Sequence, residues 1–172
     1  GGDGGQGGNA TCVGNQEGNP GQDGGDAIAT QLPLRVVNAG TVIAGGGGGG
    51  GGGARSTCLV ACSNGSGGAG GGGGAGLPPG LPGPNGAFCG GGDVCEANPQ
   101  SGTNLLGGPS DFDGDCAEAG GDGGDAGMAG QAGVDSGEAN GGLAVVPGSR
   151  VVANGNPVQW ENDGGVAYGA IN

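Results

Sequence analysis

The chain has 172 residues, of which 55 are glycine, and its sixteen acidic residues outnumber three arginines in the absence of lysine and histidine. The resulting net charge of −13 excludes a protein that tracks nucleic-acid phosphates and disfavours anionic membranes, and no apolar stretch is long enough for membrane insertion. With only two Phe, one Trp and one Tyr, an ordinary side-chain core is excluded. Backbone hydrogen bonds and cross-links must therefore supply much of the order.

Glycine-rich runs recur along the chain and predict its main elements. Gly45–Gly53 is an unbroken glycine run, and residues 119–142 repeat a Gly-x-x texture. An extended helix of the polyproline-II type suits both, because it has three residues per turn and exposes N–H and C=O groups to neighbouring helices. We expect a sandwich of such polyglycine-II helices with Gly45–Gly53 at its centre. The runs are 1–8, 18–26, 44–54, 65–76, 80–92 and 119–142, with weaker ones near 107 and 164.

Two apolar segments read as short strands instead. Residues 32–44 predict two strands around a turn at Asn38–Gly40. Residues 143–171 predict strands at 143–146, 151–153 and 158–160 that are separated by tight turns. We expect both segments to cap the ends of the rods, and no amphipathic helix is apparent. The fold class is therefore mainly coil: one glycine-rich domain, 1–172, with β-like caps and a cysteine-containing loop region at 56–118.

Other interpretations of the glycine runs are weaker. Collagen requires persistent Gly-x-x triplets with proline, and the regular stretch of this chain has neither. A flexible linker usually mixes serine with glycine, whereas serine is scarce here. A disordered linker remains the alternative to an ordered bundle.

Six cysteines in a chain with little core read as a disulfide framework, although free thiols or a zinc site remain alternatives. The local pairs Cys58 with Cys62 and Cys89 with Cys95 are the economical ones. Their spacings of four and six are looser than those of zinc knuckles. The predicted structural cysteines are Cys12, Cys58, Cys62, Cys89, Cys95 and Cys116.

Catalysis is not expected, because a chain without histidine cannot form Ser-His or Cys-His arrangements. The carboxylates lie in glycine-rich contexts with no apolar pocket to raise a pKa. Asp111, Asp113 and Asp115 follow the alternation of a calcium loop, but Cys116 occupies the position that requires glycine. We therefore predict no cofactor and no metal, with calcium at these aspartates as the weaker alternative.

Two loops carry large apolar side chains on an otherwise small-residue chain. Rigidly presented side chains of this kind are candidates for recognition, because little conformational entropy is lost when they bind. The alternative is that they pack on each other or shield the cysteines. The predicted recognition residues are Leu77, Pro78, Pro79, Leu81, Phe88, Asn104, Leu105, Leu106 and Phe112.

Two motifs occur in an order along the chain that resembles a known family. Gly24–Ala29 and Leu32–Ala44 lead directly into the glycine run, and the far end reads Val152–Trp160 followed by Tyr168–Ile171. This order resembles bacteriophage tail-fibre and tail-tip adhesins, and it covers about 20–55 and 119–172. Ala39 stands where that family usually has asparagine, and the cysteines are unusual for it.

The resemblance implies a polyglycine-II sandwich whose loops bind an outer-membrane protein or glycan of the bacterial host. It further implies other phage tail proteins as partners and an extracellular place on the virion tail. A purely structural tail-tip role is one alternative. An ice-binding protein with a polyproline-II bundle is the other.

Overall fold

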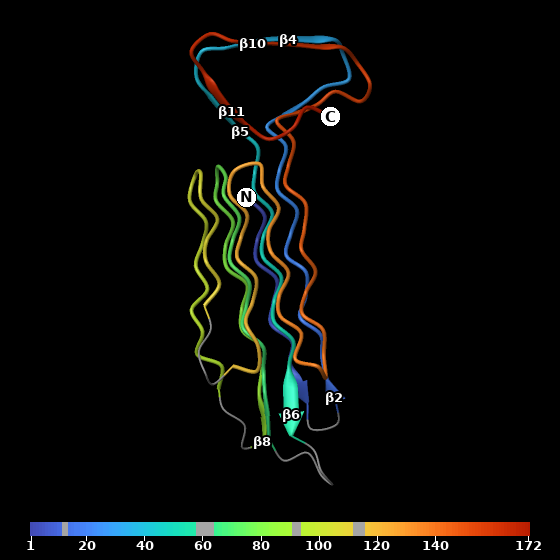
Figure 1. Cartoon of the computed structure of the whole chain (residues 1–172), viewed down its shortest axis with the longest axis vertical. Helices are drawn as coiled ribbons and strands as arrows, with labels where there is room; N and C mark the ends of the chain where they lie inside the picture. The colour runs from blue at the N-terminus through green and yellow to red at the C-terminus, as the bar shows by residue number, and fades with distance from the viewer. Residues whose placement is uncertain (12–13, 58–63, 91–93, 112–115) are drawn as a thin grey trace.

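The computed structural model describes residues 1–11, 14–57, 64–90, 94–111 and 116–172. Within these residues there is no helix, and the chain is mainly extended coil with short strands. Long extended segments run side by side along the long axis of the molecule, with a ring of strands at one end (Figure 1). The predicted fold class of mainly coil without α-helix is confirmed at this level.

Hydrogen bonds join the extended segments through their backbones, and we call each such segment a rod. The described residues contain ten rods, and consecutive rods are joined by turns or loops at the two ends of the bundle. The rods are 1–8, 16–25, 45–54, 67–75, 79–87, 98–103, 106–110, 118–126, 128–135 and 140–148.

The rod at 45–54, here called the central rod, is bonded on all sides. The amides of Gly46, Gly49 and Gly52 donate to carbonyls of the rod 67–75, each at 2.9 Å. Such a three-residue spacing turns every third amide toward the same neighbour. The other amides of the central rod donate to rods 16–25 and 128–135, and its carbonyls accept from rods 1–8, 118–126 and 140–148.

The bonding pattern arranges the rods in three layers. The middle layer contains the central rod and the rod 67–75, which is likewise bonded to six neighbours. The expectation that the nine-glycine run lies at the centre is therefore confirmed. In order across each layer, the rods are 16–25, 1–8 and 79–87 in the first layer, 140–148, 45–54, 67–75 and 98–103 in the middle layer, and 128–135, 118–126 and 106–110 in the third.

Close approach of the rods explains the glycine content at the centre. A Cβ atom added to Gly49 would lie 1.9 Å from the carbonyl oxygen of Gly121, far inside van der Waals contact. Small side chains fill what remains: Ala44, Ala54, Ala69 and Ala75 are fully buried. Val151 is the largest side chain that is completely buried. An ordinary side-chain core is thus absent from the described chain, as the composition predicts.

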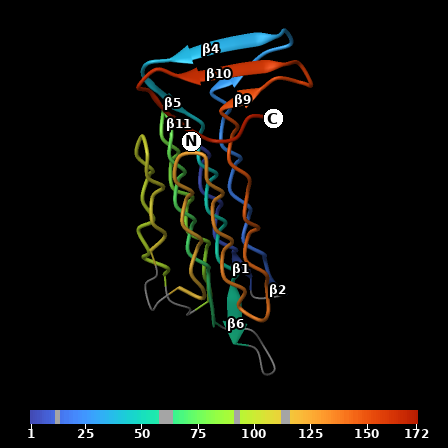
Figure 2. The ribbon, with the colours of Figure 1, turned by 45° about the horizontal axis from the view of Figure 1, so that its top comes forward.

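The ring of strands, here called the cap, consists of two stacked coils. Residues 27–44 form the first coil, and residues 150–172 form the second; Figure 2 separates them. Each side of the three-sided ring is a parallel pair with one strand from each coil. The pairs are β3 (Ile28–Ala29) with β9 (Val151–Val152), β4 (Leu34–Asn38) with β10 (Val158–Asn162), and β5 (Thr41–Ile43) with β11 (Val166–Tyr168).

Side chains hold a corner of the cap together. Asn38 is buried, and its Nδ2 donates to the carbonyl of Val166 while its Oδ1 accepts from the amide of Gly40. Trp160 lies under the guanidinium of Arg150, whose carbon is 4.5 Å from the ring centroid. The cap therefore depends on side-chain contacts that the bundle does without.

The cap corrects two details of the sequence prediction. The strands around Asn38–Gly40 are confirmed, and each pairs with a strand of the distant second coil. Residues 143–146 are not a strand, because they belong to the rod 140–148 that is bonded to the central rod. The glycines near 164 form a turn between β10 and β11, where Gly164 has φ of 76°.

The opposite end of the bundle carries short antiparallel strands. β1 (Ala10–Thr11) pairs with β2 (Gly14–Asn15). β6 (Arg55–Thr57), β7 (Asn64–Ser66) and β8 (Cys89–Gly90) form a three-stranded sheet in that order. We call this end, which lies opposite the cap, the loop end (Figure 1).

Candidate functional site

The predicted recognition residues divide between the two ends of the bundle. Leu77, Pro78 and Pro79 form the turn between rods 67–75 and 79–87 at the cap end. Leu77 is 70% exposed, and Leu81 at the start of the next rod is also exposed. Leu77 faces the cap across an open groove of about 400 Å³ that is also lined by Ile28 and Ile43.

A second turn lies beside the first at the cap end. Asn104, Leu105 and Leu106 connect rods 98–103 and 106–110, and all three are exposed. The carbonyl of Thr103 accepts the amide of Gly76, so the two turns are neighbours. The structure thus brings the Leu77 and Leu106 turns to one surface, here called the twin-turn surface.

Phe88 does not belong to the twin-turn surface. It precedes β8 at the loop end and is 44% exposed. Phe112 lies outside the described residues. The 77–88 segment therefore runs the length of the bundle, and its two apolar ends cannot bind one small ligand together.

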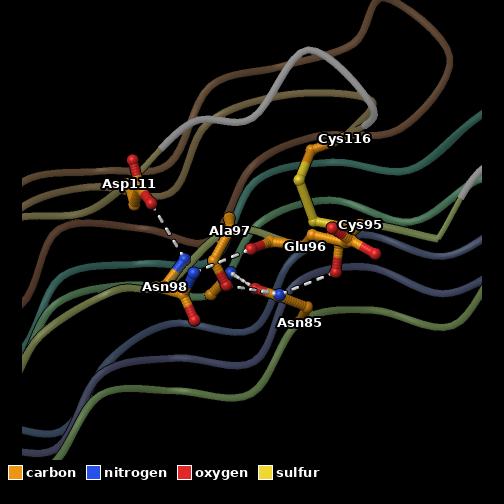
Figure 3. Close-up of a disulfide and its surroundings, with 8 residues drawn as sticks. Asn85, Cys95, Glu96, Ala97, Asn98, Asp111 and Cys116 are labelled. Atoms are coloured by element: carbon orange, nitrogen blue, oxygen red, sulfur yellow. Dashed lines mark hydrogen bonds between the residues drawn. A yellow bond between two sulfur atoms is a disulfide. The ribbon is translucent and has the colours of Figure 1, made fainter.

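The loop end contains a disulfide between Cys95 and Cys116 (Figure 3). The predicted local pair of Cys89 with Cys95 is therefore wrong. The rods 98–103 and 106–110 form an antiparallel hairpin, and this hairpin returns the chain to its starting point 21 residues later. Cys12, Cys58 and Cys62 lie outside the described residues.

Asn85, which was not among the predicted site residues, connects this disulfide to the bundle. Its Nδ2 donates to the carbonyls of Cys95 at 2.9 Å and Ala97 at 2.7 Å (Figure 3). Its Oδ1 accepts the amide of Gly70. A polar side chain that follows proline and precedes glycine in a glycine-rich run would have been the available signal.

Aspartate side chains satisfy amides at the edges of the layers. Asp122 Oδ1 accepts from the amide and the hydroxyl of Ser110, and Asp125 Oδ1 accepts from the amide of Gly107. Asp3 does the same for the amide of Leu81. These carboxylates replace the backbone carbonyl that an outer rod lacks on its open side, so part of the acidic charge has a structural use.

The alternative of a calcium site concerns three aspartates, of which the structure describes one. Asp113 and Asp115 are outside the described residues, and Asp111 accepts the amide of Asn98 through Oδ2. Among the residues that the structure describes, no group of three or more Cys, Asp or Glu is placed to hold a metal ion. None of the described residues forms a helix long and apolar enough to span a membrane.

Comparison with known proteins identifies relatives. The family model described as "Phage tail fibre adhesin Gp38" matches residues 1–172. Among solved structures, the gp37–gp38 adhesin tip complex of the bacteriophage S16 long tail fibre is similar, with 29% identity and a TM-score of 0.40. The match covers 98% of this chain and 54% of that one, so this chain spans about half the length of the solved relative. No curated protein matches.

Proposed function

Because the chain belongs to the Gp38 family of phage tail fibre adhesins, which its model matches over residues 1–172, we propose that it attaches the virion to its bacterial host through loops on a polyglycine-II scaffold. Family membership is the observation that carries this proposal, and it assigns the chain to the virion tail. It also favours attachment over ice binding. The surface bound would be an outer-membrane protein or a glycan.

The polyglycine-II character of the scaffold is supported by the periodicity of its hydrogen bonds. Amides three residues apart in the central rod donate to one neighbouring rod, and the intervening amides donate to two others. A helix with three residues per turn and no internal hydrogen bonds produces this pattern. A β-strand would instead turn alternate amides to opposite sides.

We assign attachment to the predicted loops, with the twin-turn surface as the first candidate. Leu77 and Leu106 are each at least 60% exposed there, and Leu81, on the rod that follows the Leu77 turn, is 63% exposed. Grouped apolar side chains on rigid turns are typical of binding sites, because burial of their surface is favourable and few rotamers are lost. The remaining predicted recognition residues in the described part of the chain are Pro78, Pro79, Phe88, Asn104 and Leu105, and Phe112 is added from sequence alone.

An adhesin of a tail fibre must also be joined to that fibre, so other phage tail proteins are proposed as partners. A purely structural role is the competing function for the same family. Under that role the chain would stiffen the fibre tip, and no surface residue would matter for adsorption.

Competition for phage adsorption tests these functions. Purified chain should reduce adsorption of the parent phage to its host, whereas Leu77→Ser with Leu106→Ser should compete at least about tenfold less well. Leu143→Ser is the matched control, since Leu143 is 73% exposed on a rod outside the twin-turn surface. Absence of competition at saturating concentration would favour the structural role.

A parallel variant, Phe88→Ser, separates the two ends of the bundle. Loss of competition by this variant alone would move attachment to the loop end. Equal competition by all three variants and the unchanged chain would overturn the assignment to these loops.

A further inference from the structure

The Cys95–Cys116 disulfide encloses one half of the twin-turn surface. Asn104, Leu105 and Leu106 all lie between the two cysteines in the chain. The disulfide closes the base of the hairpin 98–110 at the loop end, and the 103–106 turn lies at its other end (Figure 1). A bond at the base therefore limits the motion of the exposed turn.

The hairpin lies at an edge of the bundle. The rod 98–103 ends the middle layer and the rod 106–110 ends the third, so within its own layer each has a neighbouring rod on one side only. Two of its contacts use side chains in place of backbone carbonyls, from Asp122 to Ser110 and from Asp125 to Gly107. Segments at an edge with few bonds open locally more often than the centre of a structure.

The disulfide is buried although its hairpin is peripheral. Cys95 and Cys116 are 6% and 5% exposed. They pack with Ala97 and with Ala69 of the middle-layer rod 67–75. Asn85 fixes the backbone of Cys95 from the other side. The folded bundle thus brings the two sulfur atoms together, and a small thiol or disulfide reaches them when the peripheral hairpin opens locally.

Resting on the proposed attachment function, we propose that this disulfide is an oxidation-dependent latch, which closes after the virion leaves the reducing bacterial cytoplasm and then fixes the 98–110 hairpin for host attachment. Cytosolic thiols stay reduced, whereas disulfides persist outside the cell. In the thiol form the hairpin is held by its edge hydrogen bonds alone.

Closure follows ordinary thiol–disulfide exchange with a small-molecule disulfide such as oxidised glutathione. One cysteine thiolate attacks the reagent, forms a mixed disulfide and releases one small thiol. The second cysteine then attacks the mixed disulfide, forms the Cys95–Cys116 bond and releases the second small thiol. The two protein thiols are oxidised, and the small disulfide takes up both electrons and both protons.

Amide hydrogen exchange of the complete chain tests the latch without any receptor. Peptides from 98–110 should exchange faster in tris(carboxyethyl)phosphine than after treatment with oxidised glutathione, by a factor on the order of 100 for a ring of this size. Peptides from the central rod and from β4 should show a smaller difference between the two states than those from 98–110. Equal protection of 98–110 in both states would overturn the proposal, as would uniform loss of protection throughout the chain.

The double variant Cys95→Ser with Cys116→Ser controls for the other cysteines. Its 98–110 peptides should exchange at the fast rate with or without reductant. Fast exchange that becomes slow on oxidation in this variant would assign the latch to another cysteine pair and contradict the proposal.

Adsorption competition with the same samples links the latch to attachment. The oxidised chain should compete better than the reduced chain, and the double variant should match the reduced chain. If no sample competes while the exchange difference persists, the attachment function fails and the redox-dependent hairpin stands. If all samples compete equally, the latch has no role in attachment.

Discussion

The bundle and the cap are held together by different kinds of contact. In the bundle, rods bind one another through backbone amides and carbonyls, and side chains are nearly absent from the interior. In the cap, two coils from distant parts of the sequence pair as parallel strands and use buried or stacked side chains such as Asn38 and Trp160. Added side-chain atoms should therefore damage the bundle, whereas removed side-chain atoms should damage the cap.

The largest effect is expected from a methyl group at the centre of the bundle. Gly49→Ala places a Cβ atom 1.9 Å from the carbonyl of Gly121, and neither rod can move without breaking its bonds to other rods. We expect a loss of about 3 kcal/mol or more, which lowers Tm by about 6–12 °C for a chain of this size. Thermal unfolding followed by calorimetry measures it.

Gly25→Ala is the matched control for this substitution. Gly25 joins a rod to the cap, and an added Cβ atom there would have no neighbour within 4 Å. Its effect should stay within about 0.5 kcal/mol. Similar destabilisation by both variants would show that glycine matters here for backbone freedom and not for the close approach of rods.

A smaller effect is expected from removing a side chain in the cap. Asn38→Ala leaves the carbonyl of Val166 and the amide of Gly40 without their side-chain partners in a buried corner. The free energy of unfolding should fall by about 1–3 kcal/mol. Chemical denaturation measures it, with exposed Gln159→Ala as the control, and an unchanged midpoint for Asn38→Ala would refute the role of this corner.

The stacked pair in the cap should contribute less. Arg150→Ala removes the guanidinium above Trp160, and we expect a loss of about 1 kcal/mol, within the usual range for such contacts. Trp160 is the single tryptophan, so its fluorescence spectrum reports directly on this site. A spectrum identical to that of the unchanged chain would contradict the stacking.

The smallest effect is expected at the surface of the cap. Arg35 and Glu161 form an ion pair at 3.5 Å, with side chains 69% and 63% exposed. Exposed pairs of this kind contribute about 0–1 kcal/mol, so Arg35→Ala should change stability by less than about 0.5 kcal/mol. The difference should vanish at about 1 M salt, where charges are screened within about 3 Å; a difference that survives would require another contact of Arg35.

The sequence allowed the elements of the bundle to be predicted better than their arrangement. A run such as Gly45–Gly53 allows few ordered states, and one of them demands neighbours on all sides. The sequence does not identify these neighbouring rods, because hydrogen bonds between glycine backbones involve no side chain that would mark the partners. The parallel pairing of β4 with β10 could not be predicted for a related reason: the two strands lie in distant parts of the sequence, and no side-chain pattern links them.

The site was predictable in its residue types and not in its placement. Exposed leucines at 77 and 106 stand out on a small-residue chain, but their shared location depends on how many rods lie between them. The Cys95–Cys116 disulfide was not predicted, because the two cysteines come close together only when the 98–110 hairpin folds. Asn85 was missed because its partners are backbone groups of other segments, which its Pro-Asn-Gly context does not identify.

Amide hydrogen exchange along the glycine run, resolved by NMR on the nitrogen-15-labelled chain, tests the backbone-bonded bundle most directly. Every amide of Gly45–Gly53 donates to a carbonyl of a neighbouring rod, so these amides should exchange only through unfolding of the whole bundle, with the slowest rates in the chain. Exchange of Gly46, Gly49 and Gly52 at the rate of an unstructured peptide would contradict the account.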